Sequence, residues 1–396
     1  MRVVVNDHSG HAFPIQLSRQ LAAEGHEVLH AYSTTFQSPK GDLDRLVSDP
    51  PGLAIFPITT REPFAKYSLI KRRRQEIEYA RCLVDRMKSF QPDVILSGTT
   101  PLFVQQHVQA YTRKSDIKFV YWCQDIYTIA IADIIRKRIG WPGMPLGYYF
   151  RRLESGLLRK STHVISITED FSAILKEWRV DPAKVTCIPN WAPMERLQPV
   201  EKRNPWSLRH GLADKICVTY SGTLGLKHNP DMLLAAAKYF QPRPDVVLLV
   251  ISEGLGADFL QKEKEHQRLD NLLLLPFQDF EVMDQVLGAS DVLLGILEKQ
   301  AGLFSVPSKV LTYLCAGKPI VLAVPPDNLS ARIIRENEAG FCVDPGDSPA
   351  FCNCIRELIE QPSLRGKVSR NARAYAEKHF RIQDISRRFM HVFINS

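Results

Sequence analysis

Short apolar runs alternate with amphipathic stretches along the whole chain, and their lengths are those of strands and helices. In the first half the apolar runs cover residues 2–6, 25–33, 53–58, 93–98, 118–123 and 163–168. The stretches between them have helical length, beginning with an amphipathic one at 14–24. Continuous apolar runs that alternate with helices are typical of a parallel sheet covered on both faces. The first half therefore predicts an α/β domain.

The second half repeats this pattern. Its apolar runs cover residues 216–222, 246–252, 271–277, 291–297, 319–324 and 340–344, and helices are expected at 230–240, 255–268, 280–288, 307–316 and 329–338. A proline-rich stretch at 187–206 joins the halves and is interpreted as a linker. We expect an N-terminal domain over 1–200, a C-terminal domain over 201–375, and a final helix at 376–396 that packs back on the N-terminal domain. The predicted fold class is α/β, with two Rossmann-like domains facing across a cleft.

Length and composition agree with this picture. The 396 residues exceed what one hydrophobic core usually supports. No apolar run approaches the ~20 residues of a membrane-spanning helix, and the N-terminus does not resemble a signal peptide, so we expect a cytoplasmic protein. The eight cysteines are scattered, without a C-x-x-C pair or a zinc-like spacing, which favours reduced thiols over a metal site.

Positive charge is concentrated in the first half. Residues 1–200 hold 27 Lys and Arg against 20 Asp and Glu, whereas residues 201–396 hold 24 against 23. Within the first half, residues 136–160 carry seven basic side chains, one acid and several aromatic rings, and KRRR at 71–74 adds a second basic cluster. This asymmetry indicates an anionic surface as partner, either lipid headgroups or nucleic acid.

The stretch YSGTLGLK, residues 220–227, joins a predicted strand to a predicted helix. It is neither a Walker A loop nor a G-x-G-x-x-G turn. Gly222 and Gly225 permit positive φ and a close approach of backbone to ligand, and the start of the following helix favours an anion. Thr223 adds a hydroxyl and Lys227 a charge suited to phosphate. A plain strand-to-helix turn with a surface lysine is the alternative.

Two further stretches end predicted strands in the same half, at 252–256 and 275–279, and a third, at 305–320, begins a predicted helix. Open α/β sheets bind ligands at this edge. The third stretch places Ser308 and Lys309 at a helix N-terminus. Ser308 either caps its own helix or donates a hydrogen bond to phosphate, or does both, and Lys309 is either solvent-exposed or a second phosphate contact. Two lysines at helix N-termini describe a diphosphate site.

Many characteristic stretches stand in a specific order: SGHAFPIQLSRQLAAEGHEV, YWCQDIY, VISITEDFSAIL, VTCIPNWAP, YSGTLGLKHNPDMLL, VISEGLGADFL, VPSKVLTYLCAGKPIV and EAGFCVDPGD. In their order and spacing the chain resembles the GT-B glycosyltransferases of family 4, and within them the branch that builds bacterial surface polysaccharides such as capsule, O-antigen and colanic acid. The resemblance implies a retaining hexosyltransferase that uses a UDP- or GDP-linked sugar as substrate, without a further cofactor.

The resemblance also implies site residues on the donor side, in the C-terminal domain. Those around the diphosphate, nucleoside, base and ribose would be Gly222, Thr223, Lys227, Glu253, Gly254, Phe277, Ser308, Lys309, Val310 and Thr312. Lys227 is also expected to act in catalysis, because a cation placed where charge develops on the leaving diphosphate lowers the barrier. The C-terminal half contains no Asp-x-Asp pair, so we expect no metal.

On the acceptor side, the resemblance implies that Gly10 leaves room for the ligands, with His11 beside it. Asp125 would face the sugar as a catalytic carboxylate, and its alternative is a structural or capping aspartate. Acceptors in this branch are often glycans on a polyprenyl-diphosphate carrier. The basic, aromatic 136–160 stretch would then rest on the inner face of the membrane; a solvated helix pair with core-facing aromatics is the alternative.

Two departures from the family pattern concern the donor side. Many members carry an arginine where this chain has Thr223. They also carry two glutamates spaced E-x7-E, at positions that are Phe304 and Thr312 here. Because the second glutamate usually holds the ribose hydroxyls, ribose recognition by this chain differs from the family pattern. Glu298 is either a substitute or a surface residue.

Two other function classes fit parts of the sequence. A sugar-nucleotide 2-epimerase shares the fold, but it would need acidic and histidine groups around the sugar ring that the sequence does not identify. A basic nucleic-acid- or membrane-binding protein without enzymatic activity would fit the pI of about 9.0. No nucleic-acid-binding motif accompanies that charge, so we expect no nucleic-acid partner.

Overall fold

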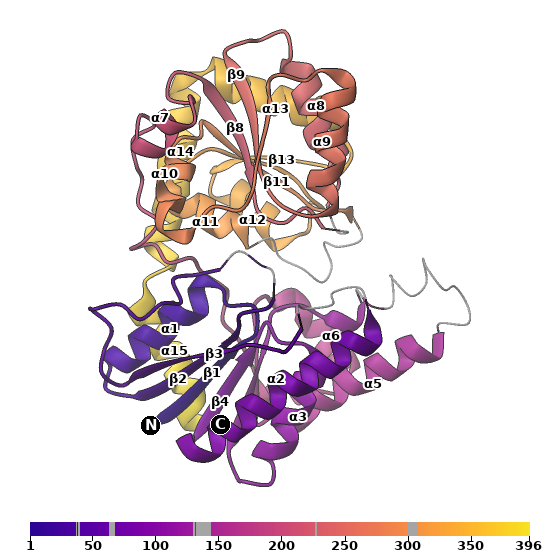
Figure 1. Cartoon of the computed structure of the whole chain (residues 1–396), viewed down its shortest axis with the longest axis vertical. Helices are drawn as coiled ribbons and strands as arrows, with labels where there is room; N and C mark the ends of the chain where they lie inside the picture. The colour runs from indigo at the N-terminus through magenta and orange to yellow at the C-terminus, as the bar shows by residue number, and fades with distance from the viewer. Residues whose placement is uncertain are drawn as a thin grey trace. The chain divides into compact units, whose positions relative to one another are not determined.

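The structure is a computed structural model that describes residues 1–36, 38, 40–62, 68–129, 131, 144–225, 228–299 and 308–396. The chain forms two compact units, shown in Figure 1. Unit 1 consists of Met1–Asn190 and Ile382–Ser396, and unit 2 consists of Trp191–Arg381. Each unit is described by itself.

Unit 1 is built on a seven-stranded parallel sheet with the order β3-β2-β1-β4-β5-β6-β7. Its strands are β1 (Arg2–Asp7), β2 (Glu27–Ser33), β3 (Leu53–Ile58), β4 (Val94–Gly98), β5 (Lys118–Cys123), β6 (His163–Ser166) and β7 (Val185–Cys187). The central β4 is buried along its whole length, as expected of a strand with helices on both faces. The strand order reverses between β1 and β4.

The helices of unit 1 form two groups (Figure 1). The first group packs together as α1 (Ala12–Ala23) and α15 (Ile382–Asn395). The second group packs in the order α2 (Leu69–Phe90), α3 (Leu102–Thr112) and α5 (Met144–Lys160). Shorter segments follow as η2 (Glu169–Phe171), α6 (Ser172–Glu177) and η3 (Pro182–Lys184).

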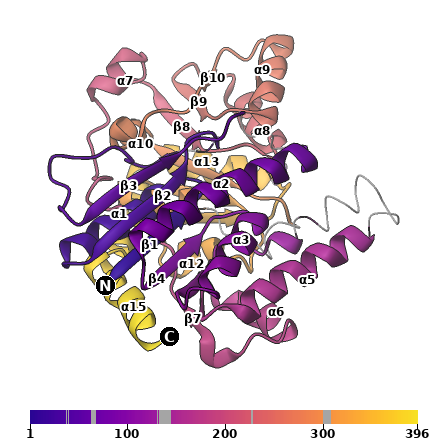
Figure 2. The same cartoon turned by 60° about the horizontal axis from the view of Figure 1, so that its bottom comes forward.

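The end of the chain is an integral part of unit 1. In α15, Phe389 packs edge-to-face on Trp122 of β5. The Ser386 hydroxyl donates to a carboxylate oxygen of Glu24 at 2.7 Å. The Lys118 ammonium donates to the carbonyl of Phe393 in the last turn of α15, where a cation is favourable. Figure 2 shows both termini in this unit.

Unit 2 has a six-stranded parallel sheet with the order β10-β9-β8-β11-β12-β13. Its strands are β8 (Ile216–Ser221), β9 (Val246–Ile251), β10 (Leu272–Leu275), β11 (Val292–Ile296), β12 (Ile320–Ala323) and β13 (Gly340–Val343). Alternate residues of one strand serve different cores: Leu248 and Val250 pack in one, Leu249 and Ile251 in the other. The sheet is therefore buried on both faces.

The helices of unit 2 divide accordingly. One core contains residues of α8 (Asp231–Phe240), α9 (Leu255–Gln267), α13 (Ser348–Glu360) and α14 (Pro362–His379). The opposite core contains residues of α7 (Pro205–Arg209) and α10 (Met283–Gly288), which follows η4 (Phe280–Val282). The remaining helices are α11 (Lys309–Ala316) and α12 (Leu329–Glu336).

The predicted α/β class and the two parallel-sheet, Rossmann-like domains are confirmed. The proline-rich stretch 187–206 contains the boundary between the two units, in agreement with its interpretation as a linker region. Its first residue ends β7 and its last two residues begin α7, and between them Ile188 and Leu197 are fully buried. The units divide after Asn190 rather than at the expected 200, and the last segment of unit 1 begins at Ile382 rather than at 376.

No helix among the described residues is long and apolar enough to cross a membrane. All eight cysteines have free thiols. Both Cys352 and Cys354 lie in α13.

Candidate functional site

The strand-order reversal in unit 1 brings the carboxyl ends of β1 and β4 together. In open α/β sheets such a reversal opens a crevice where ligands bind. The last residue of β1 is Asp7, and β4 ends at Gly98 with Thr99 directly after it. Thr99 has a positive φ of 45°, an uncommon conformation for a β-branched residue.

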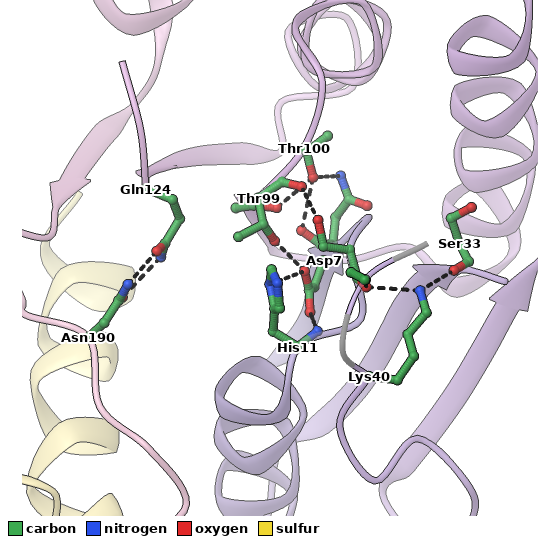
Figure 3. A network of polar contacts seen from close by, with 12 residues as sticks. Asp7, His11, Ser33, Lys40, Thr99, Thr100, Gln124 and Asn190 are labelled. Atoms are coloured by element: carbon green, nitrogen blue, oxygen red, sulfur yellow. Dashed lines mark hydrogen bonds and ion pairs between the residues drawn. The ribbon is translucent and has the colours of Figure 1, made fainter. Parts of the chain in front are cut away.

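A buried carboxylate organises this edge (Figure 3). Asp7 is only 1% exposed. One of its oxygens accepts a hydrogen bond from the Thr99 hydroxyl, and the other accepts from the backbone N–H of His11 at 2.6 Å. Burial raises the pKa of Asp7, and the neighbouring His11 partly offsets that rise. The carboxylate thus holds the loop after β1 against the loop after β4.

Lys40 ties the neighbouring loop to the same edge. Its ammonium donates to the carbonyls of Ser9 and Ser33, each at 2.9 Å (Figure 3). Burial lowers the pKa of Lys40 to about 8, although the attraction of Asp7 acts in the opposite direction. One cation therefore joins the segments that follow β1 and β2.

The two residues predicted on the acceptor side, Gly10 and His11, lie in this network. Gly10 has a φ of +72°, and a Cβ there would lie 2.9 Å from Leu43 and 3.3 Å from the Lys40 ammonium. The missing side chain therefore makes room for residues of the same unit; its role toward a ligand stays a prediction. The ring of His11 stacks on Phe13 and is partly exposed.

The segment after β5 carries the predicted catalytic Asp125, which is half-buried. Immediately before it, Gln124 exchanges two amide hydrogen bonds with Asn190, at 3.1 and 2.5 Å (Figure 3). Shortly after it, the backbone N–H groups of Tyr127 and Thr128 donate to Glu154 of α5. The backbone on both sides of Asp125 is thus held by side chains distant in sequence.

In unit 2 the strand order reverses between β8 and β11. The turn after β8 contains Gly222, with a φ of +133°, and Lys309 of α11 lies across it. A Cβ on Gly222 would be 2.9 Å from the Lys309 Cε. The Lys309 ammonium lies 3.5 Å from the centroid of the Tyr220 ring, a cation–π contact. This lysine is folded over the turn, and the alternative of an extended, solvent-exposed side chain is wrong.

Helix α11 is fixed to the same strand end. Tyr313 accepts from the backbone N–H of Ser221 at 3.0 Å and donates to its carbonyl at 3.1 Å. Ser308 makes no side-chain capping hydrogen bond, so its interpretation as the cap of its own helix is wrong. Val310 is fully buried, and the Thr312 hydroxyl bonds to the carbonyl of Lys309.

A second turn lies beside the first. The backbone N–H of Gly256 donates to the carbonyl of Leu224 at 3.2 Å, and a Cβ on Gly256 would lie 2.6 Å from the Leu224 Cβ. Gly254, with a φ of +94°, starts α9. Glu253 accepts from the backbone N–H of Phe277 at 3.2 Å. The structure therefore brings Glu253, Gly254 and Phe277 to one edge of the sheet.

The remaining predicted positions are described only in part. Lys227 and Phe304 lie outside the described residues. Thr223 is described, and its carbonyl accepts from the Tyr220 hydroxyl at 2.7 Å. Gly225 does not adopt the positive φ that a glycine permits. Glu298 is half-buried just after β11.

Several residues of the unit 1 network were not predicted from the sequence. Asp7 directly follows the first predicted strand. Polar residues in that position were singled out as candidate ligand contacts in unit 2, but not in unit 1. Glu154 is the single acid of the basic 136–160 stretch, and it stands at helical spacing from the buried Phe150 and Leu157. Lys40 and Thr99 carry no local signal, because only the fold places them at this edge.

Two family descriptions match the chain, one on each half. Glycosyltransferase Family 4 matches residues 13–196, and Glycosyl transferases group 1 matches residues 203–375. The chain belongs to glycosyltransferase family 4. Its two Rossmann-like units are those of the GT-B fold.

Curated relatives of this family 4 chain include the probable glycosyltransferase WbjE of Pseudomonas aeruginosa, which is 26% identical over 68% of this chain and 66% of the relative. Another is a UDP-Gal:alpha-D-GlcNAc-diphosphoundecaprenol alpha-1,3-galactosyltransferase of Escherichia coli, 25% identical over 57% of this chain and 58% of the relative. The matches thus span less than two thirds of the relatives' own lengths.

Among solved structures, Anabaena HepE in complex with UDP-glucose superimposes on the family 4 chain with a TM-score of 0.72, at 16% identity and covering 100% of both chains. At this identity the likeness shows the fold alone. The GT-B fold and the family membership expected from the sequence are confirmed.

Proposed function

We propose that this protein transfers a sugar from a nucleoside-diphosphate sugar to a glycan or polyprenyl-diphosphate-linked acceptor, with retention of the anomeric configuration. Family membership supports transfer with retention. The observation that carries the assignment of the donor to unit 2 is Lys309, which starts α11, lies across Gly222 and places a cation beside bare backbone at the strand-order reversal.

The chemistry of this edge suits a diphosphate. The leaving nucleoside diphosphate gains negative charge as the glycosidic bond breaks, and fixed cations and N–H groups stabilise that charge. Lys309 supplies a cation, and the starts of α9 and α11 supply N–H groups and favourable dipole ends. Lys227, Thr223 and Ser308 are proposed to complete the phosphate contacts. Glu253 and Phe277 are proposed to line the nucleoside side.

Unit 1 is assigned the acceptor and the reacting face of the sugar. Asp125 is the proposed catalytic carboxylate, because its backbone is anchored on both sides and its side chain remains half-exposed. The lipid-linked, diphosphate-bearing acceptor named for the Escherichia coli relative supports a comparable acceptor here and a role in surface polysaccharide synthesis. UDP is favoured as the nucleotide by the ligands named for that relative and for HepE.

The test is transfer from UDP- and GDP-sugars to undecaprenyl-diphosphate-linked N-acetylglucosamine, followed by mass spectrometry and anomer analysis by NMR. We expect Lys309→Met to lower turnover at least tenfold. Lys262→Met, at an exposed lysine of α9 in the same unit, is the matched control and should turn over normally. A nucleotide sugar that changes configuration without an acceptor would instead identify an epimerase, and an absence of binding to any nucleotide sugar would refute the proposal.

We also propose that α5 rests on an anionic membrane surface. Its exposed face carries Met144, Tyr148 and Tyr149, which are 62%, 61% and 44% exposed. Arg152 lies over the Tyr148 ring and accompanies them, while Phe150 on the same helix points into the core. Aromatic rings and basic side chains on one helix face are suited to a headgroup region.

A sedimentation assay with vesicles of phosphatidylglycerol and phosphatidylcholine tests this surface. The double variant Tyr148→Ala/Tyr149→Ala should bind several-fold more weakly, and wild-type binding should fall with added salt. Tyr239→Ala, at a tyrosine of unit 2 that is 43% exposed, is the control. Equal binding of all three proteins would rule out α5 as the contact.

A further inference from the structure

The loop at 124–128 depends on one buried carboxylate of α5. Glu154 is fully buried. Its Oε1 accepts from the backbone N–H of Tyr127 at 3.0 Å, and its Oε2 accepts from the backbone N–H of Thr128 at 2.7 Å and from the Thr128 hydroxyl. A carboxylate this deep is costly unless donors surround it, and here both oxygens are bonded to one loop.

These three donors stand where a helical segment begins, at residues 127–129. The first N–H groups of a helix have no partner within the helix, and a side-chain acceptor fixes the place where the chain turns. Glu154 supplies that acceptor from a helix 26 residues further along the chain. Because the start of the helical segment is fixed, the residues directly before it, Asp125 and Ile126, are fixed as well.

We propose that Glu154 is a positioning residue for sugar transfer, which holds Asp125 in place through the N–H groups of Tyr127 and Thr128. This inference rests on the proposed function, in which Asp125 lies beside the sugar. The amide pair of Gln124 and Asn190 is the second anchor of the loop, on the opposite side of Asp125. With both anchors in place, the segment 124–128 cannot move relative to Glu154 and Asn190 without breaking the hydrogen bonds that these residues make with it.

The surroundings of Glu154 make its ionisation a second observable. Tyr121 and Cys123 of β5 face it, as do Asp125 and Tyr127 of the loop. Burial raises the pKa of Glu154 to about 7, against the lowering effect of the Thr128 and Tyr127 hydrogen bonds. An ionised carboxylate accepts all three hydrogen bonds more strongly than a protonated one. The hold on the loop should therefore weaken as the pH falls below about 7.

The first experiment compares wild type with Glu154→Gln in the transfer assay. Glutamine keeps the size but directs an N–H₂ group at a backbone N–H. We expect kcat to fall at least tenfold, while KM for the nucleotide sugar stays within twofold, because the donor contacts lie in unit 2. The fall of wild-type kcat below pH 7 should be weaker in the variant. Glu27→Gln, at an exposed carboxylate of unit 1, is the matched control.

Amide hydrogen exchange locates the effect. In Glu154→Gln the amides of Tyr127 and Thr128 should exchange faster, while those of β4 and β5 keep their wild-type rates. Thr128→Val removes one donor of the same set and should lower kcat less, in the same direction. Thr128→Ser keeps the hydroxyl and should have the kcat of wild type. The effects of Thr128→Val and Glu154→Gln should be less than additive, because both act through one contact.

Two results would overturn the inference. One is a Glu154→Gln protein with the kcat of wild type. The other is faster exchange throughout β4 and β5, which would make Glu154 a residue of structural stability only. A wild-type protein that transfers no sugar would refute the proposed function, and with it the positioning role. The exchange rates of Tyr127 and Thr128 would still show whether Glu154 holds the loop, so the two failures are distinguishable.

Discussion

The two units share a parallel-sheet topology but differ in the kinds of polar residue that they bury. Among the described residues, unit 1 buries Asp7, His8, His30, Glu76 and Glu154. The buried polar residues in the described part of unit 2 are uncharged: Asn204, Ser207, Thr219, Ser252, Ser290, Asn328 and Ser330. Unit 1 buries ionisable side chains, of which Asp7 and Glu154 hold its loops, whereas unit 2 presents glycines, backbone and the partly exposed Lys309.

Under the proposed function, the difference follows from what each edge would accommodate. A diphosphate brings its own charge, so bare N–H groups and a cation suffice, and glycines let the backbone come close. Charged groups already buried in that edge would compete for the same contacts. The loops of unit 1 need a different device, because their shape must be fixed by side chains from other strands. Buried ionisable groups make that shape dependent on pH, and this consequence can be measured.

The largest expected effect is on the pH dependence of stability. Burial, with help from Arg19, lowers the pKa of His30 from 6.5 to about 3. The unfolded chain therefore binds a proton below pH 6.5 that the folded chain refuses, so this stability is present above pH 6.5 and is lost as the pH falls toward 3. The gap in unfolding free energy between wild type and His30→Asn should shift by about 1.4 kcal/mol per pH unit, or about 3 kcal/mol at pH 4.

Unit 2 provides the contrast for this measurement. Asn328 is as buried as His30, accepts from the backbone N–H of Ser330 at 3.0 Å and carries no ionisable group. The gap between wild type and Asn328→Ala should stay constant from pH 7 to pH 4 in urea-unfolding curves. Unfolding of each unit can be followed by pulsed labelling of the buried thiols Cys123 and Cys217. A His30→Asn gap that does not change with pH would break the comparison.

The next effect concerns Gly222, at the edge of unit 2 where we propose that the donor binds. Gly222→Val places a β-branched residue at a φ of +133°, and its Cβ collides with Lys309. Backbone strain of about 1–3 kcal/mol, together with a displaced cation, should lower kcat/KM for the nucleotide sugar roughly a hundredfold. Gly225→Ala, where φ is not positive and no described atom lies within 4 Å of the new Cβ, should cost less than about threefold. Equal losses in the two variants would mean that the turn only needs flexibility.

A smaller effect is expected from the ends of the two central strands, Asp7 of β1 and Ser221 of β8. Asp7→Ala leaves the N–H of His11 and the hydroxyl of Thr99 without their acceptor, which should cost about 2 kcal/mol of unfolding free energy. Asp7→Asn should cost less, because the Thr99 hydroxyl can rotate and accept. Ser221→Ala should change stability by less than about 0.5 kcal/mol, since its backbone makes the contacts with Tyr313. Thermal unfolding measures all three.

The fold was largely predictable from the sequence, and the reason is local. Every long apolar run became a strand within about two residues at each end, because runs such as 53–58 and 118–123 are apolar on both faces. The short β7 was missed, since three half-buried residues before a proline-rich stretch carry no period. The burial of Ile188 and Leu197 in the linker region was not predictable either, because prolines mark irregular backbone but say nothing about burial.

Candidate site residues could be identified from the sequence only where one short segment carries a recognisable pattern. Gly222, Gly254 and Lys309 stand in such segments. Asp7 and Thr99 are 92 residues apart, and their contact exists only because β1 and β4 are neighbours. Glu154 was visible as a lone acid among basic residues, but its role required knowing which loop α5 covers.

The smallest effect tests whether the first turn of α11 in unit 2 tolerates a carboxylate. Thr312 occupies the position of the family glutamate that holds ribose, and its hydroxyl bonds to the carbonyl of Lys309 in its own helix. Thr312→Glu should therefore fold normally and bind the nucleoside diphosphate about three- to tenfold more tightly, the gain of roughly one charge-assisted hydrogen bond. Thr312→Gln is the control for size, and calorimetry with UDP gives both affinities. Weaker binding of Thr312→Glu than of Thr312→Gln would show that a carboxylate at this position repels the diphosphate, and that the site requires an uncharged residue there.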